Sequence, residues 1–353
     1  MAAYTTIDDS EAYFQAKLYT GDGSAITPTF DGETDMIPAI VWFKAREGSV
    51  AHNLTTSVIG VQKYFRVNET DGEVSDANSI TAFSSDGFSA GTSHSIDGTD
   101  YVAWCWKAGT TSGINATGAD ITPGAYSFDQ TAGISIIKYT GNSTTDQQVA
   151  HGLGAVPHFI ICKVVDADNA QNWDTYHHKN TAAPETYYLS LNLTNATADA
   201  AARWQDTVPT SVLFTVGDAG AVNQTGDSIL AFCFTSIQGY SKFSGFTGNG
   251  NADSTFVYTG FRPAWIMIKR TDGANGWVIY DNKRQGYNIN NDELFADEDS
   301  AEVTTDDRLL ILSNGFKPLS ASQDHNGNGS AYIYAAFAEA PLVNSEGVPC
   351  NAR

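Results

Sequence analysis

A match to the nucleophile-elbow pattern G-x-S-x-G lies at Gly87 to Gly91, with Ser89 at its centre. In hydrolases this pattern holds a serine on a sharp turn between a strand and a helix, where a histidine can activate it. Here it belongs to an Asp-Gly-Phe turn that recurs as Asn-Gly-Phe at Asn314 to Phe316, and Lys317 then stands in the place of Ser89. Because lysine replaces the serine in that second copy, we interpret the match as a structural turn.

An oxygen-rich stretch, DHNGNG, begins at Asp324 and resembles the start of a calcium-binding loop. Asp324, Asn326 and Asn328 would offer side-chain oxygens at alternate positions. An EF-hand also needs Glu at the twelfth position of the loop, and Ala335 occupies that place. Two interpretations stay open: a turn rich in Gly and Asn, or a calcium site of another kind built from these three side chains. We expect no other cofactor.

Neither the histidines nor the carboxylates form a recognisable catalytic set. His177 and His178 are adjacent, so on a strand their side chains would point to opposite faces and could not chelate one ion together. Two carboxylates suffice for glycoside hydrolysis, but the Asp and Glu residues are spread over loops rich in Asn, Gly and Ser, and no pair stands out. We therefore predict that the protein is not an enzyme.

Aromatic residues offer a second kind of chemistry, the stacking of rings on sugar faces. Trp173 and Tyr176 lie in the segment NWDTYHH, and Trp277 and Tyr280 hold the same places in GWVIYDN. Their rings could form a glycan-binding surface. The same recurrence is also expected for residues that pack in a core, so both interpretations stay open.

The composition indicates which elements position these residues. The chain has 353 residues, with 16 Tyr, 18 Phe and 32 Gly and many Thr, Val and Ile. This alphabet favours strands over helices, and clusters of Thr, Asn, Asp, Ser and Gly separate short apolar runs, as in all-β proteins. Only Ala196 to Trp204 (ATADAAARW) predicts a helical turn or two.

The charge excludes several classes of partner. The formal net charge is −21, with 19 Lys+Arg against 40 Asp+Glu. Without a basic stripe the protein lacks the cations that neutralise phosphates, so we expect no binding to nucleic acid or to an anionic membrane surface. No apolar run is long enough to span a bilayer. The N-terminal MAAYTTIDDSEAYF has no basic segment followed by a hydrophobic one, so we expect no secretory signal.

A short phrase occurs three times and marks an internal repeat. The phrase reads YTGDG at Tyr19, YTGNS at Tyr139 and FTGNG at Phe246. Each copy is followed by a proline, an apolar run, a lysine six residues after the proline, and a polar turn. The matching residues are Pro38, Pro157 and Pro263, and Lys44, Lys163 and Lys269. Similar phrases in the same order, at spacings of domain size, indicate diverged copies of one unit.

Each copy closes on an aromatic apolar segment, YVAWCW, ILAFCF or YIYAAF, in which Cys105, Cys233 and Ala336 correspond. Unpaired cysteines of this kind pack as small hydrophobic residues. Continuous apolar runs of strand length favour strands buried on both faces, so we predict three tandem, diverged β-sandwich units of a jelly-roll or lectin-like kind. The predicted division is an N-terminal arm 1–18, repeats 19–110, 139–245 and 246–341, a linker with a lead-in strand 111–138, and a C-terminal tail 342–353.

These residues also carry a resemblance to a known family. The similarity is carried by the segments YTTIDDSEAYFQAKLYTGDG, YVAWCWKAG, FVYTGFRPAWIMIKR and WVIYDNKR and by the terminal NAR. Through these segments the chain is similar to a family of proteins encoded by marine bacteriophages. The resemblance covers essentially the whole chain, although the ending AEAPLVNSEGVPCNAR is longer than the family pattern. Members are usually described as virion structural or tail-associated proteins without an established enzymatic activity. The resemblance therefore implies a virion component that contacts the host.

The leading hypothesis is a structural protein of a tailed-phage virion, associated with the tail or tail fibre and taking part in host-surface attachment. One alternative is a capsid decoration or head-fibre protein, and another is a tail polysaccharide depolymerase. The expected partners are other virion proteins, a bacterial surface glycan and further copies of the chain, with a trimer as one candidate assembly. The expected location is the virion, assembled in the host cytoplasm.

Overall fold

Regular structure in this computed structural model is almost entirely antiparallel strand. The structure describes residues 5–284, 288, 292–305 and 308–341. Within them only short helical turns interrupt the strands: α1 (Ala201–Trp204), α2 (Gly220–Asn223), η1 (Ser10–Ala12), η2 (Thr92–His94) and η3 (Pro184–Thr186). The all-β class expected from composition is confirmed, and α1 lies within the segment predicted to form a helical turn. The predicted C-terminal tail lies outside the described residues.

Three large antiparallel sheets account for most of the strands. In order, the first contains β1 (Phe14–Thr20), β8 (Asp100–Trp106), β2 (Ile40–Ala45), β3 (Asn53–Thr56), β4 (Lys63–Arg66) and β5 (Val74–Ser75). The second contains β9 (Ala125–Asp129), β10 (Ile134–Thr140), β17 (Ser228–Phe234), β12 (Phe159–Val164), β13 (Asp174–His177), β14 (Tyr187–Ser190) and β15 (Ala198–Asp199). The third contains β18 (Ser241–Thr247), β25 (Ala331–Pro341), β20 (Phe261–Arg270), β21 (Trp277–Asp281) and β22 (Leu294–Phe295).

The three sheets share one strand order and one register. In each, the first strand pairs with the closing strand, which pairs with the strand that carries the repeated lysine; three further strands follow in the first and second sheets and two in the third. The lysines lie opposite the third residue of the closing strand in every copy: Lys44 opposite Val102, Lys163 opposite Leu230 and Lys269 opposite Ile333. The predicted repetition of strand order and lysine position is confirmed.

A smaller sheet covers one face of each large sheet. These sheets contain β6 (Ile80–Ser84) with β7 (Gly87–Ala90), β11 (Gln147–Ala150) with β16 (Leu213–Val216), and β19 (Val257–Tyr258) with β24 (Gly315–Pro318) and β23 (Leu309–Leu312). Apolar side chains from both sheets form one cluster in each unit. Each unit is therefore a β-sandwich, as predicted.

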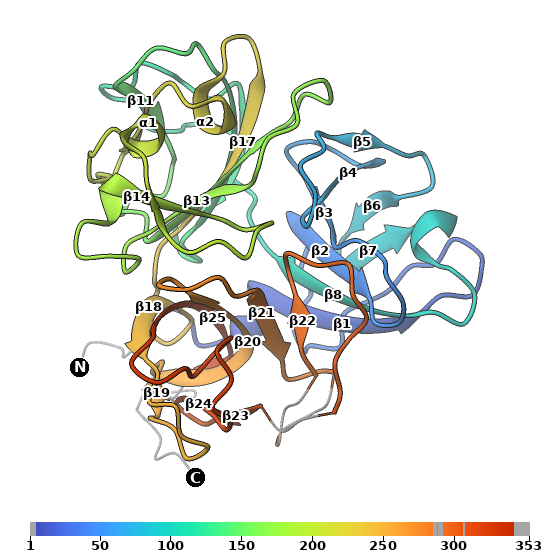
Figure 1. Cartoon of the computed structure of the whole chain (residues 1–353). Coiled ribbons are helices and arrows are strands. Elements are labelled where there is room, and N and C mark those ends of the chain that lie inside the picture. Colours follow the sequence, from blue (N-terminus) through green and yellow to red (C-terminus); the bar gives the residue numbers. More distant parts are fainter. Residues whose placement is uncertain (1–4, 285–287, 289–291, 306–307, 342–353) are drawn as a thin grey trace.

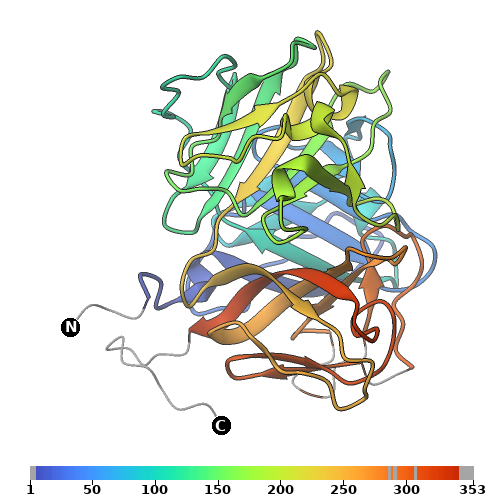
Figure 2. The same ribbon diagram turned by 60° about the vertical axis from the view of Figure 1, so that its left-hand side comes forward.

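The other face of each large sheet points to a core that all three units share. Along β8, for example, Trp104 and Trp106 enter this shared core, whereas Ala103 and Cys105 enter the sandwich of the first unit. Alternation of this kind follows from the period of two along a strand. It explains why the lysine-bearing strands read as continuous apolar runs: both of their faces are buried. Figures 1 and 2 show the three lobes gathered around this centre.

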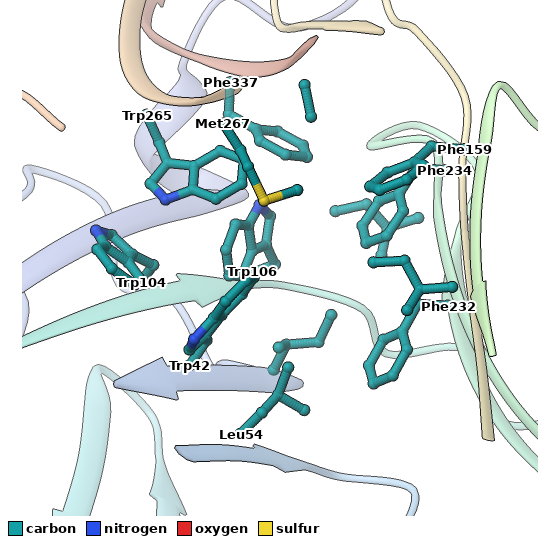
Figure 3. Close-up of a cluster of buried hydrophobic side chains, with 14 of the residues drawn as sticks. Trp42, Leu54, Trp104, Trp106, Phe159, Phe232, Phe234, Trp265, Met267 and Phe337 are labelled. Carbon is teal, nitrogen blue, oxygen red and sulfur yellow. The ribbon is translucent and has the colours of Figure 1, made fainter. Parts of the chain in front are cut away.

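Aromatic rings from all three units meet in the shared core (Figure 3). Trp106 of the first unit and Phe234 of the second both lie against Phe337 of the third, with ring centroids 5.5 and 6.2 Å apart. These three residues hold the same place in the closing strand, opposite the first residue of the first strand. A cavity of about 30 Å³ remains there, lined only by apolar side chains. Without polar partners it should stay dry.

Equivalent contacts join each unit to the next. In each joint a main-chain N–H of one unit donates to a main-chain carbonyl of the next. Glu73 N donates to Val165 O at 2.7 Å, Thr197 N donates to Thr271 O at 2.9 Å, and Glu302 N donates to Arg46 O at 2.8 Å. The three acceptors each lie two residues after a repeated lysine. The first unit thus contacts the second, the second the third, and the third the first. Three equivalent head-to-tail contacts that close describe an approximate threefold ring within one chain.

The unit boundaries differ from those expected. The repeated Tyr/Phe-Thr-Gly phrase stands at the end of the first strand, because its glycine makes the turn that follows. The first strands begin at Phe14, Ile134 and Ser241, each five residues before the predicted start. Residues 14–18, predicted as part of an N-terminal arm, therefore belong to β1. In the predicted linker, β9 is the lead-in strand and pairs with β10 at the sheet edge.

Candidate functional site

The four aromatic residues considered for glycan stacking are buried. Trp173 and Tyr280 are 0% exposed, and Tyr176 and Trp277 are 2% exposed, so their ring faces cannot stack on a sugar from solution. The packing interpretation holds for all four. Tyr176 packs in the second sandwich against Trp204.

The two tryptophans anchor the joints between units. Trp173 Nε1 donates to Arg66 O and Glu69 O of the first unit at 3.3 and 3.2 Å. Trp277 Nε1 donates to Ser190 O of the second unit at 2.9 Å. Arg66 and Ser190 are the last residues of matching strands, β4 and β14. The recurrence that suggested a binding surface therefore comes from a repeated joint.

The repeated lysines belong to the same joints. Lys163 Nζ donates to Thr70 O of the first unit at 2.7 Å, and Lys269 Nζ donates to Thr194 O of the second unit at 2.8 Å. Lys44 Nζ donates to the neighbouring Ala45 O at 2.7 Å. Burial lowers the pKa of each lysine to about 8. Main-chain carbonyls rather than carboxylates hold these cations, so the cluster has the chemistry of a structural anchor.

The DHNGNG stretch is a turn in which the side chains of Asp324 and Asn326 are already engaged. Asn326 Oδ1 accepts the N–H of Asn249 at 3.0 Å, and its Nδ2 donates to Ser320 O at 2.8 Å. Asp324 accepts from Asn275 Nδ2 at 2.9 Å and from Ser322 Oγ at 3.1 Å. Asn328 is exposed. The turn interpretation fits these bonds, because the Asn326 side-chain oxygen already accepts the main-chain N–H of Asn249.

Among the described residues, no group of three or more His, Cys, Asp or Glu side chains is placed to hold a metal ion. The adjacent histidines make separate main-chain contacts. His177 Nε2 lies 3.3 Å from Tyr334 O, and His178 Nε2 lies 2.8 Å from Phe243 O. Burial lowers the pKa of both imidazoles, so they are neutral at neutral pH.

A hydrogen-bonded chain of Ser320, His325, Tyr280 and Glu293 lies beside the same turn. Ser320 Oγ is 2.9 Å from His325 Nε2, and His325 Nδ1 is 3.7 Å from Glu293 Oε1. Tyr280 OH donates to Glu293. The order of groups resembles an activated serine, but the step from imidazole to carboxylate is too long for a hydrogen bond. His325 is fully buried, and its pKa is lowered to about 4 by that burial.

Ser89 of the G-x-S-x-G match lies within strand β7, not on a turn that leads into a helix. Its hydroxyl is 3.4 Å from Thr27 Oγ1. A nucleophile elbow needs the strand, turn and helix arrangement, so the structural interpretation of this match holds.

Charged side chains close the ring between the third unit and the first. Arg284 pairs with two carboxylates of its own unit: its Nε donates to Asp281 Oδ2 at 2.6 Å, and its Nη1 donates to Glu302 Oε2 at 2.9 Å. Arg46 of the first unit donates from Nη2 to Glu302 Oε1 at 2.8 Å. Trp104 Nε1 of the first unit donates to Asp281 Oδ2 at 2.9 Å. Burial raises the pKa of Asp281, but the Arg284 charge and these hydrogen bonds outweigh it and lower the pKa overall.

An open groove of about 540 Å³ lies where β18 and the loop before it face β19; we call it the β18–β19 groove. Tyr258 stands on its wall with 49% of its surface exposed. Lys242 Nζ lies 5.0 Å from the centre of the Tyr258 ring and donates to Tyr258 O at 2.8 Å. His178 and the exposed Gln238 also line the groove. Of the described cavities, this one combines an exposed aromatic ring with a cation.

Residues 9–341 match a protein family described as a domain of unknown function (DUF7483). The chain belongs to this family. No curated protein matches it. No helix in the described residues is long and apolar enough to cross a membrane.

The groove and the charged cluster were not found from the sequence. Both are built from residues that differ from their counterparts in the other two copies. A comparison of the three copies could therefore have revealed them. Asp281 stands where the other copies have Thr56 and His177, and Arg284 follows it in a turn. Tyr258 lies in a two-residue strand, which is too short to show a periodic pattern.

Proposed function

We propose that the protein is a non-enzymatic structural component of a tailed-phage virion, associated with the tail or tail fibre, that takes part in attachment to the host surface. The phage assignment rests on the resemblance described above. The structural observation that supports it is the closed ring of three equivalent joints around a shared core. A body of approximate threefold symmetry can sit on a threefold-symmetric assembly through three similar contacts.

The same observation supports a second candidate, a capsid decoration protein. A threefold body also fits the local threefold positions of an icosahedral shell, where it would contact three neighbouring subunits. A reconstruction of the intact virion separates the two. Density for the chain on the tail supports the first proposal, density on the head supports the second, and absence of the chain from purified particles overturns both.

Attachment is tested by adsorption of fluorescently labelled protein to host cells and to a non-host strain. We expect saturable adsorption to the host alone. The non-enzymatic part is tested by spotting purified protein on a host lawn and measuring reducing ends released from host polysaccharide. A halo with released reducing ends would show a depolymerase instead, and Ser320→Ala would then test whether the Ser320–His325 pair carries the reaction.

A further inference from the structure

We propose that the β18–β19 groove binds an acidic saccharide, one that carries carboxylate groups. The inference rests on the proposed attachment function and specifies its ligand. The size of the groove suits such a ligand. Pockets for small ligands commonly enclose about 300–1,000 Å³, and this groove encloses about 540 Å³.

The charge of the groove is opposite to that of the protein. The chain has 40 Asp+Glu and 19 Lys+Arg, yet the groove is lined by the cation Lys242, with the neutral His178 beside it, and by no acidic side chain. A second cation, the exposed Lys179, packs beside Gly245 of β18. An anion that approaches this acidic protein is repelled elsewhere and attracted here, and a lysine in a partly desolvated site binds carboxylates through charge-assisted hydrogen bonds.

The exposed ring indicates a saccharide. Tyr258 is a rigid aromatic residue with an apolar face and a polar end, so it gives a large contact area at low entropic cost. A sugar offers an apolar C–H face to such a ring and hydroxyl groups to the side. Gln238, exposed on the lining, has both a donor and an acceptor for those hydroxyls.

A peptide strand is less suited to this place. β18 is the edge strand of its sheet, and an extended peptide would bind by pairing with its main chain. However, Phe243 N already donates to Ser236 Oγ at 3.0 Å, and Phe243 O lies 2.8 Å from His178 Nε2. These side chains occupy the main-chain groups that an added strand would use in the groove.

The experiment is a calorimetric titration of the full chain with trigalacturonate, with a neutral trisaccharide of galactose and with a short polyglutamate peptide. The variants are Tyr258→Ala, Tyr258→Phe, Lys242→Gln and, as a matched control outside the groove, Lys63→Gln. Thermal unfolding first establishes that each variant is folded. We expect trigalacturonate to bind, and Tyr258→Ala and Lys242→Gln each to weaken it at least about tenfold. Tyr258→Phe and Lys63→Gln should bind as the wild type does.

Three results would overturn the inference: no binding of trigalacturonate, equal binding of the neutral sugar or the peptide, or unchanged binding by Tyr258→Ala and Lys242→Gln. Adsorption of the same variants to host cells separates this inference from the proposed function. If the wild type and both groove variants adsorb equally well, attachment stands and the groove assignment fails. If the wild type does not adsorb at all, the attachment proposal itself fails.

Discussion

Lys44, Lys163 and Lys269 are fully buried, which is rare for lysine. Each lies at a joint between units, and two of them donate to a main-chain carbonyl of the preceding unit. Burial lowers the pKa of each to about 8, whereas a lysine in the unfolded chain has a pKa of about 10.4. Between about pH 8 and pH 10 the unfolded chain therefore binds more protons at these sites, and their contribution to stability rises with pH.

We expect the stability of the wild type relative to Lys163→Met to increase by up to about 1.4 kcal/mol per pH unit from about pH 8 to pH 10. The comparison with a variant is needed because Cys105, Cys162 and Cys233 act in the opposite direction. Burial raises the pKa of these thiols, so the unfolded chain loses those protons first. Urea unfolding at several pH values measures the difference, and a flat difference would contradict the prediction. The control is Lys63→Met, which removes a partly exposed lysine that pairs with Glu73 at 2.8 Å.

The cysteines of the closing strands were expected to be buried and reduced. Cys105 and Cys233 are free and fully buried, and Ala336 occupies the same position opposite the lysine-bearing strand in the third unit. The position needs a small apolar side chain, as expected. Because only the thiolate reacts, we expect both to be labelled by a thiol reagent only after unfolding. Peptide mass spectrometry with and without urea checks this, and rapid labelling in native buffer would show that the sandwiches open.

At the scale of the element, the repeated Thr-Gly phrase forms a turn against the loop before the closing strand. A Cβ on its glycine would overlap a main-chain carbonyl oxygen of that loop in each copy: Gly21 and Ile96, Gly141 and Gln224, Gly248 and Gly327. The N–H of the next residue donates to a side-chain oxygen there, in the pairs Asp22 with Ser95, Asn142 with Asn223, and Asn249 with Asn326. The phrase recurs because this close approach recurs.

Gly141→Ala should destabilise the protein by about 1–3 kcal/mol, because the added methyl group forces the turn and the loop apart. Gly109→Ala is the control. Its Cβ would meet no atom within 4 Å, and a surface change of this kind usually alters stability by less than about 0.5 kcal/mol. Chemical denaturation measures both. Equal stability of the two variants would show that the turn adapts without cost.

At the scale of the whole molecule, the joint that closes the ring differs from the other two. It keeps the equivalent main-chain bond, Glu302 N to Arg46 O. It adds buried ion pairs in which Arg284 links Asp281 and Glu302. The other two joints are made between units adjacent in the chain, whereas this one connects residues more than half the chain apart. Buried charges accept few alternative partners, so they specify this contact.

Arg284→Met should cost about 3–5 kcal/mol, because it leaves the Asp281 carboxylate buried without its cation. The double variant Arg284→Met with Asp281→Asn should lose less than the single variant, since no uncompensated charge remains. The control is Arg66→Met, whose ion pair with Asp71 is exposed and should contribute less than about 1 kcal/mol. Calorimetric unfolding gives the values. A small effect of Arg284→Met would show that the shared apolar core alone closes the ring.

The sequence alone predicts the all-β class, the three copies, the burial of the lysine-bearing strands on both faces and the repeated positions of Lys44, Lys163 and Lys269. These features follow from local patterns, such as apolar runs, glycine turns and fixed spacings, which each unit carries within its own residues. The predicted start of each unit nevertheless falls within its first strand and not at the beginning of that strand. The Thr-Gly phrase marks the end of a strand as readily as the start of a unit.

The places of the aromatic residues and the contacts that join the units could be seen only in three dimensions. Trp173 donates to a carbonyl more than 100 residues earlier, and Arg46 meets Glu302 across 256 residues. The β18–β19 groove likewise brings together His178, Gln238 and Tyr258 from separate segments. The alternation of side chains along a single strand carries no information about contacts between residues so far apart in the sequence. These contacts arise because three sheets, each with an apolar face left uncovered by its own unit, can bury those faces only against one another.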